Sequence, residues 1–434
     1  MEYITKDQGS YQLHIIKTNA FKTITVKIYL KEIAKKENIT KRNFLNDILL
    51  LSNEDYKTKS SFNKALQNLY AANINIATRR LGSYLDTCFT LRVLNDKYTE
   101  KGNFEQAIAF FTSVLLRPNV TDGAFDEKNF QTVYEDYQAD LNSLKDDRRL
   151  YAIIRLLEET NKKQALASTY RSVGYQEDLQ KITKQNLYQY YLEMLKHNLI
   201  DIYVLGDVDE VEVQNLFRQY FQINTYKLRK QPILLKEIPT TRSKTITECL
   251  PSNQSQLCMS LSTNNLTDYE RNYPLSIYNT ILGGGTDSML FKEVREENSL
   301  AYYIGSSPSK FDRLILINGG ITNSSSKEVT RLIKKQLKKL TKGSFTEENI
   351  QAAKEFYLSA LDDIKESANR LIESYYMMDL LGVDDIETKR EKIQKVTKEE
   401  VIAVANKVKI NTIFVLEGED NATNWNKRSR KHCI

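Results

Sequence analysis

The residue types that most often carry chemistry are sparse in this sequence, and their spacing limits what they can do. The chain of 434 residues contains three histidines, His14, His197 and His432. No two of them stand four residues apart, as the two imidazoles of a helical zinc site must. Cys88 lies in an apolar segment with no histidine nearby, so a structural thiol is favoured over a nucleophile. The sequence predicts no metal ligands and no catalytic residues for the chain alone.

A glycine run is the other segment whose residue types could bind a ligand. Gly283, Gly284 and Gly285 are followed by Thr286, without the Lys and Ser/Thr ending of a phosphate-binding loop. No GxGxxG pattern follows a strand-like segment, and no GxSxG elbow is present. Nucleotide binding and serine hydrolase chemistry are therefore unsupported.

Composition and charge exclude several classes of protein. Charged residues make up 27% and hydrophobic residues 41%, as in folded globular chains. A net charge of +6, taken as spread over the chain, predicts no nucleic-acid partner. No apolar run approaches the ~18 residues of a membrane span, and the first residues form no secretory leader, so no membrane association is expected. With no CxxC pair, the cysteines fit a cytoplasmic location; they are Cys88, Cys249, Cys258 and Cys433.

The elements that must position any site are written twice along the chain. Residues 123–130, GAFDEKNF, return as residues 343–350, GSFTEENI. An amphipathic helix precedes each copy, at 104–116 and 327–340, and a long helical stretch follows each copy. Further along, Thr183 and Thr397 are each placed to cap a helix that leads into a strand. The sequence predicts an internal duplication.

Strands interleave with these helices, because apolar, β-rich segments occur in both halves. The predicted fold class is α+β, with two homologous α/β-roll domains, each a mainly antiparallel sheet with helices packed on one face. The predicted strands cover residues 23–30, 85–93, 202–206, 256–261, 313–319 and 413–416. A stretch with two prolines and five basic residues fits a linker at 227–242. The domains are expected at 1–226 and 243–434.

The glycine run and the segment after it resemble a known family. The pattern GG…LF.E.RE…LAY, from Gly283 to Tyr302, is similar to the pitrilysin/insulinase-type (inverzincin) metallopeptidases. The resemblance covers nearly the whole chain, and it is closest to the non-catalytic YmfF-type members. It implies two homologous domains, an HxxEH zinc helix after the first strand of the first domain, and an Arg/Tyr pair in the second.

At the position that the resemblance assigns to HxxEH, the chain departs from the family. It carries Asn43, Asn46 and Asp47 there, just after Thr40, the expected N-cap. Amides replace the first imidazole and the general base, and a carboxylate replaces the second imidazole. The third ligand of the family would fall at Asp140, with Glu135 as the other candidate. These residues are otherwise ordinary polar positions of a helix, or a weak oxygen-ligand metal site.

The Arg/Tyr pair implied by the resemblance is present as Arg295 and Tyr302. A guanidinium and a phenol can hold a substrate carbonyl or share the charge that develops on a scissile oxygen. The alternatives are an exposed helix residue for Arg295 and half-buried packing for Tyr302. The glycine run would let a peptide backbone approach closely, or would simply form a turn next to a helix.

The resemblance therefore implies a function without catalysis by this chain. We expect an inactive metallopeptidase homologue, the substrate-holding subunit of a heterodimeric zinc peptidase in peptide processing. The HxxEH-bearing partner would hold the zinc, and this chain would hold no cofactor. One alternative is a peptide-binding or scaffold protein in modification of the translation factor EF-P or in bacteriocin leader-peptide maturation, without composite catalysis. The other alternative is an independent hydrolase with an unrecognised site.

Overall fold

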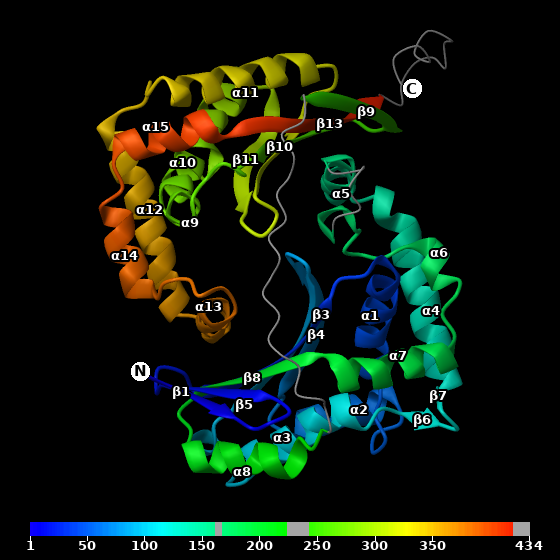
Figure 1. Cartoon of the computed structure of the whole chain (residues 1–434). Helices are drawn as coiled ribbons and strands as arrows, with labels where there is room; N and C mark the ends of the chain where they lie inside the picture. Colours follow the sequence, from blue (N-terminus) through cyan, green and yellow to red (C-terminus); the bar gives the residue numbers. More distant parts are fainter. Residues whose placement is uncertain (161–166, 224–242, 420–434) are drawn as a thin grey trace. The chain divides into compact units, whose positions relative to one another are not determined.

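The structure of the chain is a computed structural model that describes residues 1–160, 167–223 and 243–419 (Figure 1). The linker expected at 227–242 lies outside the described residues, as do His432 and Cys433. The chain divides into two compact units, and each of them is discontinuous in sequence. The first comprises Met1–Ser143, the described part of Arg171–Ile233, and Lys365–Leu381; the second comprises the described parts of Leu144–Tyr170, Leu234–Ile364 and Gly382–Ile434.

The first unit is built on a six-stranded sheet with the strand order β1-β2-β8-β3-β5-β4. All neighbouring strands are antiparallel except β2 and β8, which are parallel. Side chains alternate across the sheet, so that Ile28 and Leu30 face the hydrophobic core while Tyr29 faces away from it. The strands are β1 (Glu2–Asp7), β2 (Gln12–Lys17), β3 (Thr23–Ile33), β4 (Asn73–Leu81), β5 (Tyr84–Leu94) and β8 (Leu199–Gly206).

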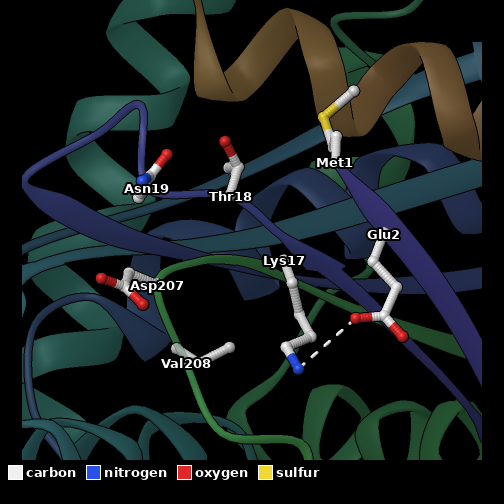
Figure 2. A pocket seen from close by; sticks show the side chains of 7 residues that line it. All are labelled: Met1, Glu2, Lys17, Thr18, Asn19, Asp207 and Val208. Carbon is white, nitrogen blue, oxygen red and sulfur yellow. Dashed lines mark ion pairs between the residues drawn. The ribbon is translucent and has the colours of Figure 1, made fainter.

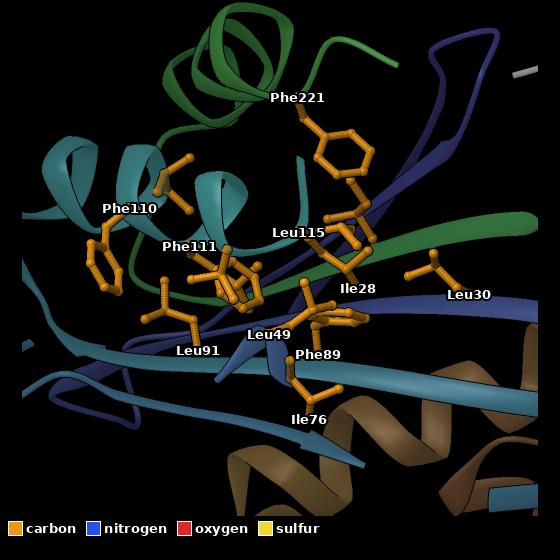
Figure 3. Close-up of a cluster of buried hydrophobic side chains, with 14 of the residues drawn as sticks. Ile28, Leu30, Leu49, Ile76, Phe89, Leu91, Phe110, Phe111, Leu115 and Phe221 are labelled. Carbon is orange, nitrogen blue, oxygen red and sulfur yellow. The ribbon is translucent and has the colours of Figure 1, made fainter. Parts of the chain in front are cut away.

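Helices cover the core face of this sheet. Figure 3 shows buried hydrophobic side chains between these helices and the strands. Phe111 and Leu115 meet Phe89 and Leu91 of β5 there, all almost completely buried. Burial of this apolar surface holds the layer together. The helices are α1 (Lys36–Leu49), α2 (Lys59–Asn68), α3 (Asn103–Leu116), α4 (Glu127–Asn142), α6 (Gln176–Leu179), α7 (Lys184–His197) and α8 (Glu210–Tyr220); a ribbon of β6 (Val120–Thr121) and β7 (Ala124–Phe125) precedes α4.

The second unit repeats this plan with a five-stranded sheet, ordered β11-β12-β10-β13-β9. Strand β13 pairs with β9 in parallel, as β8 does with β2, and the other pairs are antiparallel. The order therefore matches β4-β5-β3-β8-β2 strand for strand, and the predicted duplication and fold class are confirmed. The strands are β9 (Lys244–Pro251), β10 (Ser255–Ser262), β11 (Ala301–Ser309), β12 (Leu314–Ile321) and β13 (Lys409–Glu419).

The helices of the second unit occupy the same places in the order of elements. Both predicted threonine caps are confirmed, because Thr183 accepts from the backbone N–H of Asn186 and Thr397 from that of Glu400. Each cap fixes the start of the helix that leads into the central strand β8 or β13. The helices are α9 (Asp268–Asn272), α10 (Pro274–Gly283), a π-helix η4 (Phe291–Glu297), α11 (Ser326–Thr341), α12 (Glu347–Lys365), α14 (Ile386–Gln394) and α15 (Lys398–Lys407).

One helix from each sequence half belongs to the compact unit of the other half. Helix α5 (Arg148–Thr160) is part of the second unit and α13 (Ala368–Leu381) is part of the first. They stand at corresponding places in the two repeats, directly after α4 and α12. Each covers the sheet face that points away from the main core: α5 buries Leu156 against Phe414 of β13, whose neighbours Ile413 and Val415 face the main core.

Polar and aromatic contacts fix α13 on the first sheet. The Tyr376 ring stacks on Tyr29 of β3 with centroids 3.9 Å apart, and its hydroxyl donates to the buried Asp86 Oδ1 at 3.0 Å. Glu373 of α13 pairs with Arg79 of β4 at 2.6 Å. The predicted layer of helices on one face is therefore complemented by a single exchanged helix on the other. No helix in the described ranges is long and apolar enough to cross a membrane.

Candidate functional site

The helix that carries the degenerate motif is α1, which follows β3 as the family pattern requires. It begins at Lys36, with Lys35 at the N-cap, so the predicted cap at Thr40 is wrong. The charged residues before Thr40 are good helix formers, and Glu37 in the first turn favours the positive end of the helix dipole. Thr40 is instead buried one turn inside the helix, where its hydroxyl accepts from the Tyr175 N–H at 3.0 Å.

Asn43 is engaged by a loop at residues 172–175. Its side-chain amide donates to the Ser172 carbonyl at 2.7 Å, and the Tyr137 hydroxyl of α4 donates to the Val173 carbonyl at 2.6 Å. Gly174 has a φ of +86°, and a Cβ there would lie 2.5 Å from the Tyr137 hydroxyl. The position of the first imidazole in active relatives is therefore tied to a loop by an amide that donates.

Asn46 takes the place of the general base and is bound to the sheet. It is almost completely buried, and its amide donates to Thr78 Oγ1 of β4 at 2.9 Å. Thr78 in turn shares a hydrogen bond of 2.7 Å with Thr87 of β5. A neutral amide oriented in this way has no lone pair basic enough to take a proton from water.

Asp47 faces the acidic side of α4. Partial desolvation, followed by the charges of Asp140 and then Asp136, raises the pKa of Asp47 to about 6. All three carboxylates still reach solvent, so water screens part of this repulsion. Glu135 is hydrogen-bonded to Gln131 at 2.7 Å. The fold thus brings Asp47 near Asp140, and it adds Asp136, which lies one helical turn before Asp140 and which the sequence analysis did not single out.

These residues do not fit a zinc ion. Among the described residues, no group of three or more His, Cys, Asp or Glu side chains could hold a metal ion. Asn43 and Asn46 use their amide N–H groups in hydrogen bonds, and no imidazole lies on α1. A zinc site needs deprotonated nitrogen, sulfur or oxygen ligands in tetrahedral order. No chemical step through a metal can therefore be assigned to this helix.

The acidic environment of Asp47 gives a testable pH dependence. Asp47→Asn should raise the free energy of unfolding at pH 7 by about 0.5–1 kcal/mol, a value reduced for solvent screening. The pKa is raised to about 6 in the folded chain from 3.8, so the carboxylate costs stability above pH 6 and nothing below pH 4. Urea unfolding at both pH values measures this, with Glu391→Gln as the exposed control. A variant that is no more stable than the parent at pH 7 would contradict it.

In the second unit, η4 carries Arg295 as an exposed residue. The Arg295 guanidinium carbon lies 4.7 Å from the centroid of the Phe291 ring. The helix is fixed from behind by the largely buried Glu293, which pairs with Lys335 at 2.6 Å and Lys339 at 3.4 Å on α11. Arg295 thus stands on an anchored turn with its charge in solvent.

Tyr302 lies at the start of β11, an edge strand of the described sheet. The pairing register with β12 shifts between Ala301 and Tyr303, so Tyr302 is the extra residue of a β-bulge. Bulges re-aim side chains, and the Tyr302 side chain is 62% exposed. An aromatic ring of this size in solvent at a sheet edge is available for a ligand. The fold therefore presents both Arg295 and Tyr302 on the surface of the second unit.

The glycine run ends α10, and two of its glycines have packing roles. A Cβ on Gly283 would lie 2.7 Å from the backbone nitrogen of Ser306 on β11, and one on Gly284 would lie 2.7 Å from Thr280 Cα. A Cβ on Gly285 would meet only the edge of Phe356, at 3.8 Å. Gly283 is thus explained by close contact of helix and strand, whereas Gly285 is open to an incoming backbone.

Alanine substitutions separate these two roles. Gly283→Ala should lower the free energy of unfolding by about 1–3 kcal/mol, because α10 or β11 must shift to accept the methyl group. Gly285→Ala should change it by less than about 0.5 kcal/mol. Urea unfolding of the two variants gives both values. Equal stability of the two variants would rule out the proposed contact with Ser306.

Other candidate residues lie apart from these positions. A pocket of about 400 Å³ at one end of the first sheet is shown in Figure 2. It is lined by Met1, Glu2, Lys17, Thr18, Asn19, Asp207 and Val208. None of the residues expected in a site borders this pocket. Two of its charged side chains, Lys17 and Glu2, neutralise each other in an ion pair at 3.4 Å.

The histidines are likewise separated. His14 is buried in β2, where its Nδ1 is 2.7 Å from the Tyr3 hydroxyl and its ring stacks on Tyr203. His197 ends α7 and pairs with Glu193 at 3.0 Å, and His432 lies outside the described residues. Desolvation raises the pKa of the Cys88 thiol to about 11, which disfavours the nucleophilic thiolate.

Comparisons with known proteins agree with this geometry. Residues 181–357 match the model of the Peptidase M16 inactive domain. The chain is 26% identical over 430 residues to the "Probable inactive metalloprotease YmfF" of Bacillus subtilis, covering 98% of this chain and 100% of that protein. The crystal structure of a conserved protein from Enterococcus faecalis superposes with a TM-score of 0.89 at 27% identity, over 97% of this chain and 100% of that one. A peptidase M16 inactive domain from Pseudomonas fluorescens shares the fold, with a TM-score of 0.78 at 16% identity over 98% of this chain and 100% of that one.

Two duplicated α+β units, with amides and one carboxylate on the helix where a metallopeptidase carries histidines, define an inactive metallopeptidase homologue. The chain is similar to the M16 peptidases, the pitrilysin/insulinase type, and in particular to proteins of that type described as inactive.

Proposed function

We propose that the chain is the substrate-holding subunit of a heterodimeric zinc peptidase that processes peptides, with the zinc held by an HxxEH-bearing partner. One observation carries the proposal: Arg295 and Tyr302 stand exposed on an anchored turn and an edge strand, while α1 carries no imidazole. Tyr302 is 62% exposed at a β-bulge, so its ring and hydroxyl are accessible to a ligand. The pair is suited to act on a substrate that another subunit hydrolyses.

The chemistry of the two side chains supports this role. Arginine presents up to five N–H donors in a fixed fork, and tyrosine presents one O–H donor. Both can donate to the carbonyl of an extended peptide, and more strongly to the oxyanion that forms when the partner's water attacks it. An extended peptide can also pair with a free sheet edge, which gives affinity through main-chain hydrogen bonds. The open backbone at Gly285 suits the approach of such a peptide.

Reconstitution tests the proposal. Each chain alone, and the two chains mixed, would be assayed by size-exclusion chromatography and by cleavage of a fluorogenic peptide library. The proposal expects a one-to-one complex and cleavage that needs both chains. A partner that cleaves equally well alone would refute it. A complex that forms without any gain in cleavage would favour the scaffold role in EF-P modification or leader-peptide maturation. We also propose a cytoplasmic location, which cell fractionation would test.

A further inference from the structure

Helix α11 is far more basic than the chain as a whole, contrary to the even spread of charge expected from composition. Helix α11, SKEVTRLIKKQLKKLT, carries six basic side chains and one acidic side chain, a net charge of +5, against +6 for the whole chain. Like charges three and four residues apart destabilise a helix, so this arrangement works against folding. Folding alone therefore does not account for the composition of α11.

The charges are arranged as a line along one exposed face. Lys327, Arg331, Lys334, Lys338 and Lys342 follow one another at intervals of three or four residues, and all five are exposed. At about 1.5 Å per residue they lie roughly 4.5–6 Å apart along the helix axis. This row of five residues is called the basic row below.

The other two lysines of α11 form ion pairs within the unit, but most residues of the basic row do not. Lys335 and Lys339 pair with Glu293 of η4, and Arg331 pairs with Glu328 at 2.6 Å. Within the described part of the chain, no ion pair involves Lys327, Lys334, Lys338 or Lys342. The basic row thus presents four uncompensated charges to solvent.

The internal duplication supplies a comparison for this face. Helix α3 is the counterpart of α11, because each follows the second strand of the hairpin at the edge of its sheet, β5 or β12. In the first unit α8 packs on α3 (Figure 1). The Tyr220 hydroxyl of α8 donates to Glu105 of α3 at 2.9 Å. Most of α3 is buried, against the sheet as well as against α8, whereas the basic row of α11 is exposed among the described residues. The fold has a place for a packed helix on this face, and only the first unit fills it from within the described residues.

The side chains on the exposed face of α11 indicate which class of partner could bind there. The apolar residues of α11, such as Leu332 and Ile333, are buried in the core of the unit, so the helix cannot insert into a lipid surface. The exposed face has no aromatic residue on which a nucleobase could stack. A row of cations at helical spacing instead matches carboxylates at the i, i+3, i+4 and i+7 positions of another helix. Residues 420–434 of the chain are themselves basic in sequence, with Lys427, Arg428, Arg430 and Lys431, and do not match.

We propose that the basic row of α11 is a docking surface for an acidic helical segment of a partner protein. The inference is independent of the proposed role in peptide cleavage, because it uses neither Arg295 nor Tyr302. The two predictions can fail separately.

Fluorescence anisotropy with the full chain tests the inference. The probe is a labelled alanine-based helical peptide with glutamates at i, i+3, i+4 and i+7, and the reference is the same peptide with glutamines. We expect salt-sensitive binding of the glutamate peptide that weakens at least about tenfold in the triple variant Lys327→Glu, Lys334→Glu, Lys338→Glu. The neutral triple variant with glutamines should give an intermediate loss. Thermal unfolding should be unchanged or higher, because repulsion within the helix is relieved.

A matched control shows whether the loss of peptide binding comes from the basic row or from the change in net charge. Lys57, Lys59 and Lys64 are exposed on and before α2, so their reversal changes the net charge by the same amount. This control should retain binding within about twofold. The inference is overturned by an equal loss in both triples, or by no preference for the glutamate peptide at low salt. Tighter binding of oligouridine RNA or phosphatidylglycerol vesicles of matched charge would also overturn it.

Discussion

Replacing Arg295 with alanine should lower the rate of peptide cleavage by the two-chain assembly about 10²–10³-fold, with the assembly still formed. The size follows from the loss of one charged donor to an oxyanion, the largest single contribution in many acyl-transfer sites. Arg295 is exposed and stacks on Phe291, so its removal should leave the free energy of unfolding almost unchanged. The measurement is kcat/KM of the assembly with and without the substitution.

The control for this prediction lies on the same turn. Lys292 is also exposed on η4 and pairs with the exposed Asp287 at 3.2 Å, so Lys292→Ala removes a nearby charge without removing the proposed donor. It should retain cleavage within about threefold, and Tyr302→Phe should cost about tenfold through one lost hydrogen bond. Equal effects of Arg295→Ala and Lys292→Ala would indicate general electrostatics, and full activity of Arg295→Ala would exclude a composite site.

Tyr376→Ala should lower the free energy of unfolding of the first unit by about 3–5 kcal/mol, the largest effect on stability that we expect. Tyr376 helps to fix the exchanged helix α13 on the first sheet: it is completely buried, stacks on Tyr29 at 3.9 Å and donates to Asp86. Truncation removes the stacking, leaves a cavity against β3, and deprives a buried carboxylate of a donor. Burial raises the pKa of Asp86, because the buried carboxylate is poorly solvated. The hydrogen bond from Tyr376 stabilises this carboxylate, so its loss costs stability.

Tyr376→Phe separates the ring from the hydroxyl. It keeps the stacking on Tyr29 and loses only the hydrogen bond to Asp86, so the expected cost is about 1–2 kcal/mol. Urea unfolding monitored by tyrosine fluorescence gives both values, with the exposed Tyr98→Ala as a reference within about 0.5 kcal/mol. A small effect of Tyr376→Ala would mean that α13 is not needed to hold the first sheet.

Local sequence patterns predicted those parts of the fold that local physics determines. The repeat at 123–130 and 343–350 marks the start of α4 and α12, and the threonines at 183 and 397 cap α7 and α15. Alternation of apolar residues located the central strands of both sheets. Turn and capping signals act over a few residues, so they remain visible in one sequence.

The exchange of α5 and α13 could not be predicted in this way. Residues 148–160 and 368–381 have ordinary amphipathic patterns, and nothing local states which sheet they cover. Their partners, such as Glu248 for Arg155 at 2.7 Å and Asp86 for Tyr376, lie far away in sequence. Pairings of this kind depend on the tertiary fold.

In the candidate site, too, some features could be predicted from the sequence and others depend on the tertiary fold. The motif positions Asn43, Asn46 and Asp47 follow from the family pattern, and the structure places them on α1 after β3. The loop at 172–175 that binds Asn43 and Tyr137 comes from a distant part of the chain, and no local signal announces it. The bulge that exposes Tyr302 depends on the register with β12, which no local pattern specifies.

The most direct test of the central claim is the zinc content of the purified, untagged chain, measured together with its peptidase activity. The claim is that α1, with two amides and a carboxylate in place of the zinc ligands and the general base, cannot seat a hydrolytic metal. It predicts far less than one zinc per chain after dialysis and no cleavage that a chelator abolishes. One tightly held zinc per chain, with chelator-sensitive cleavage by the chain alone, would contradict it.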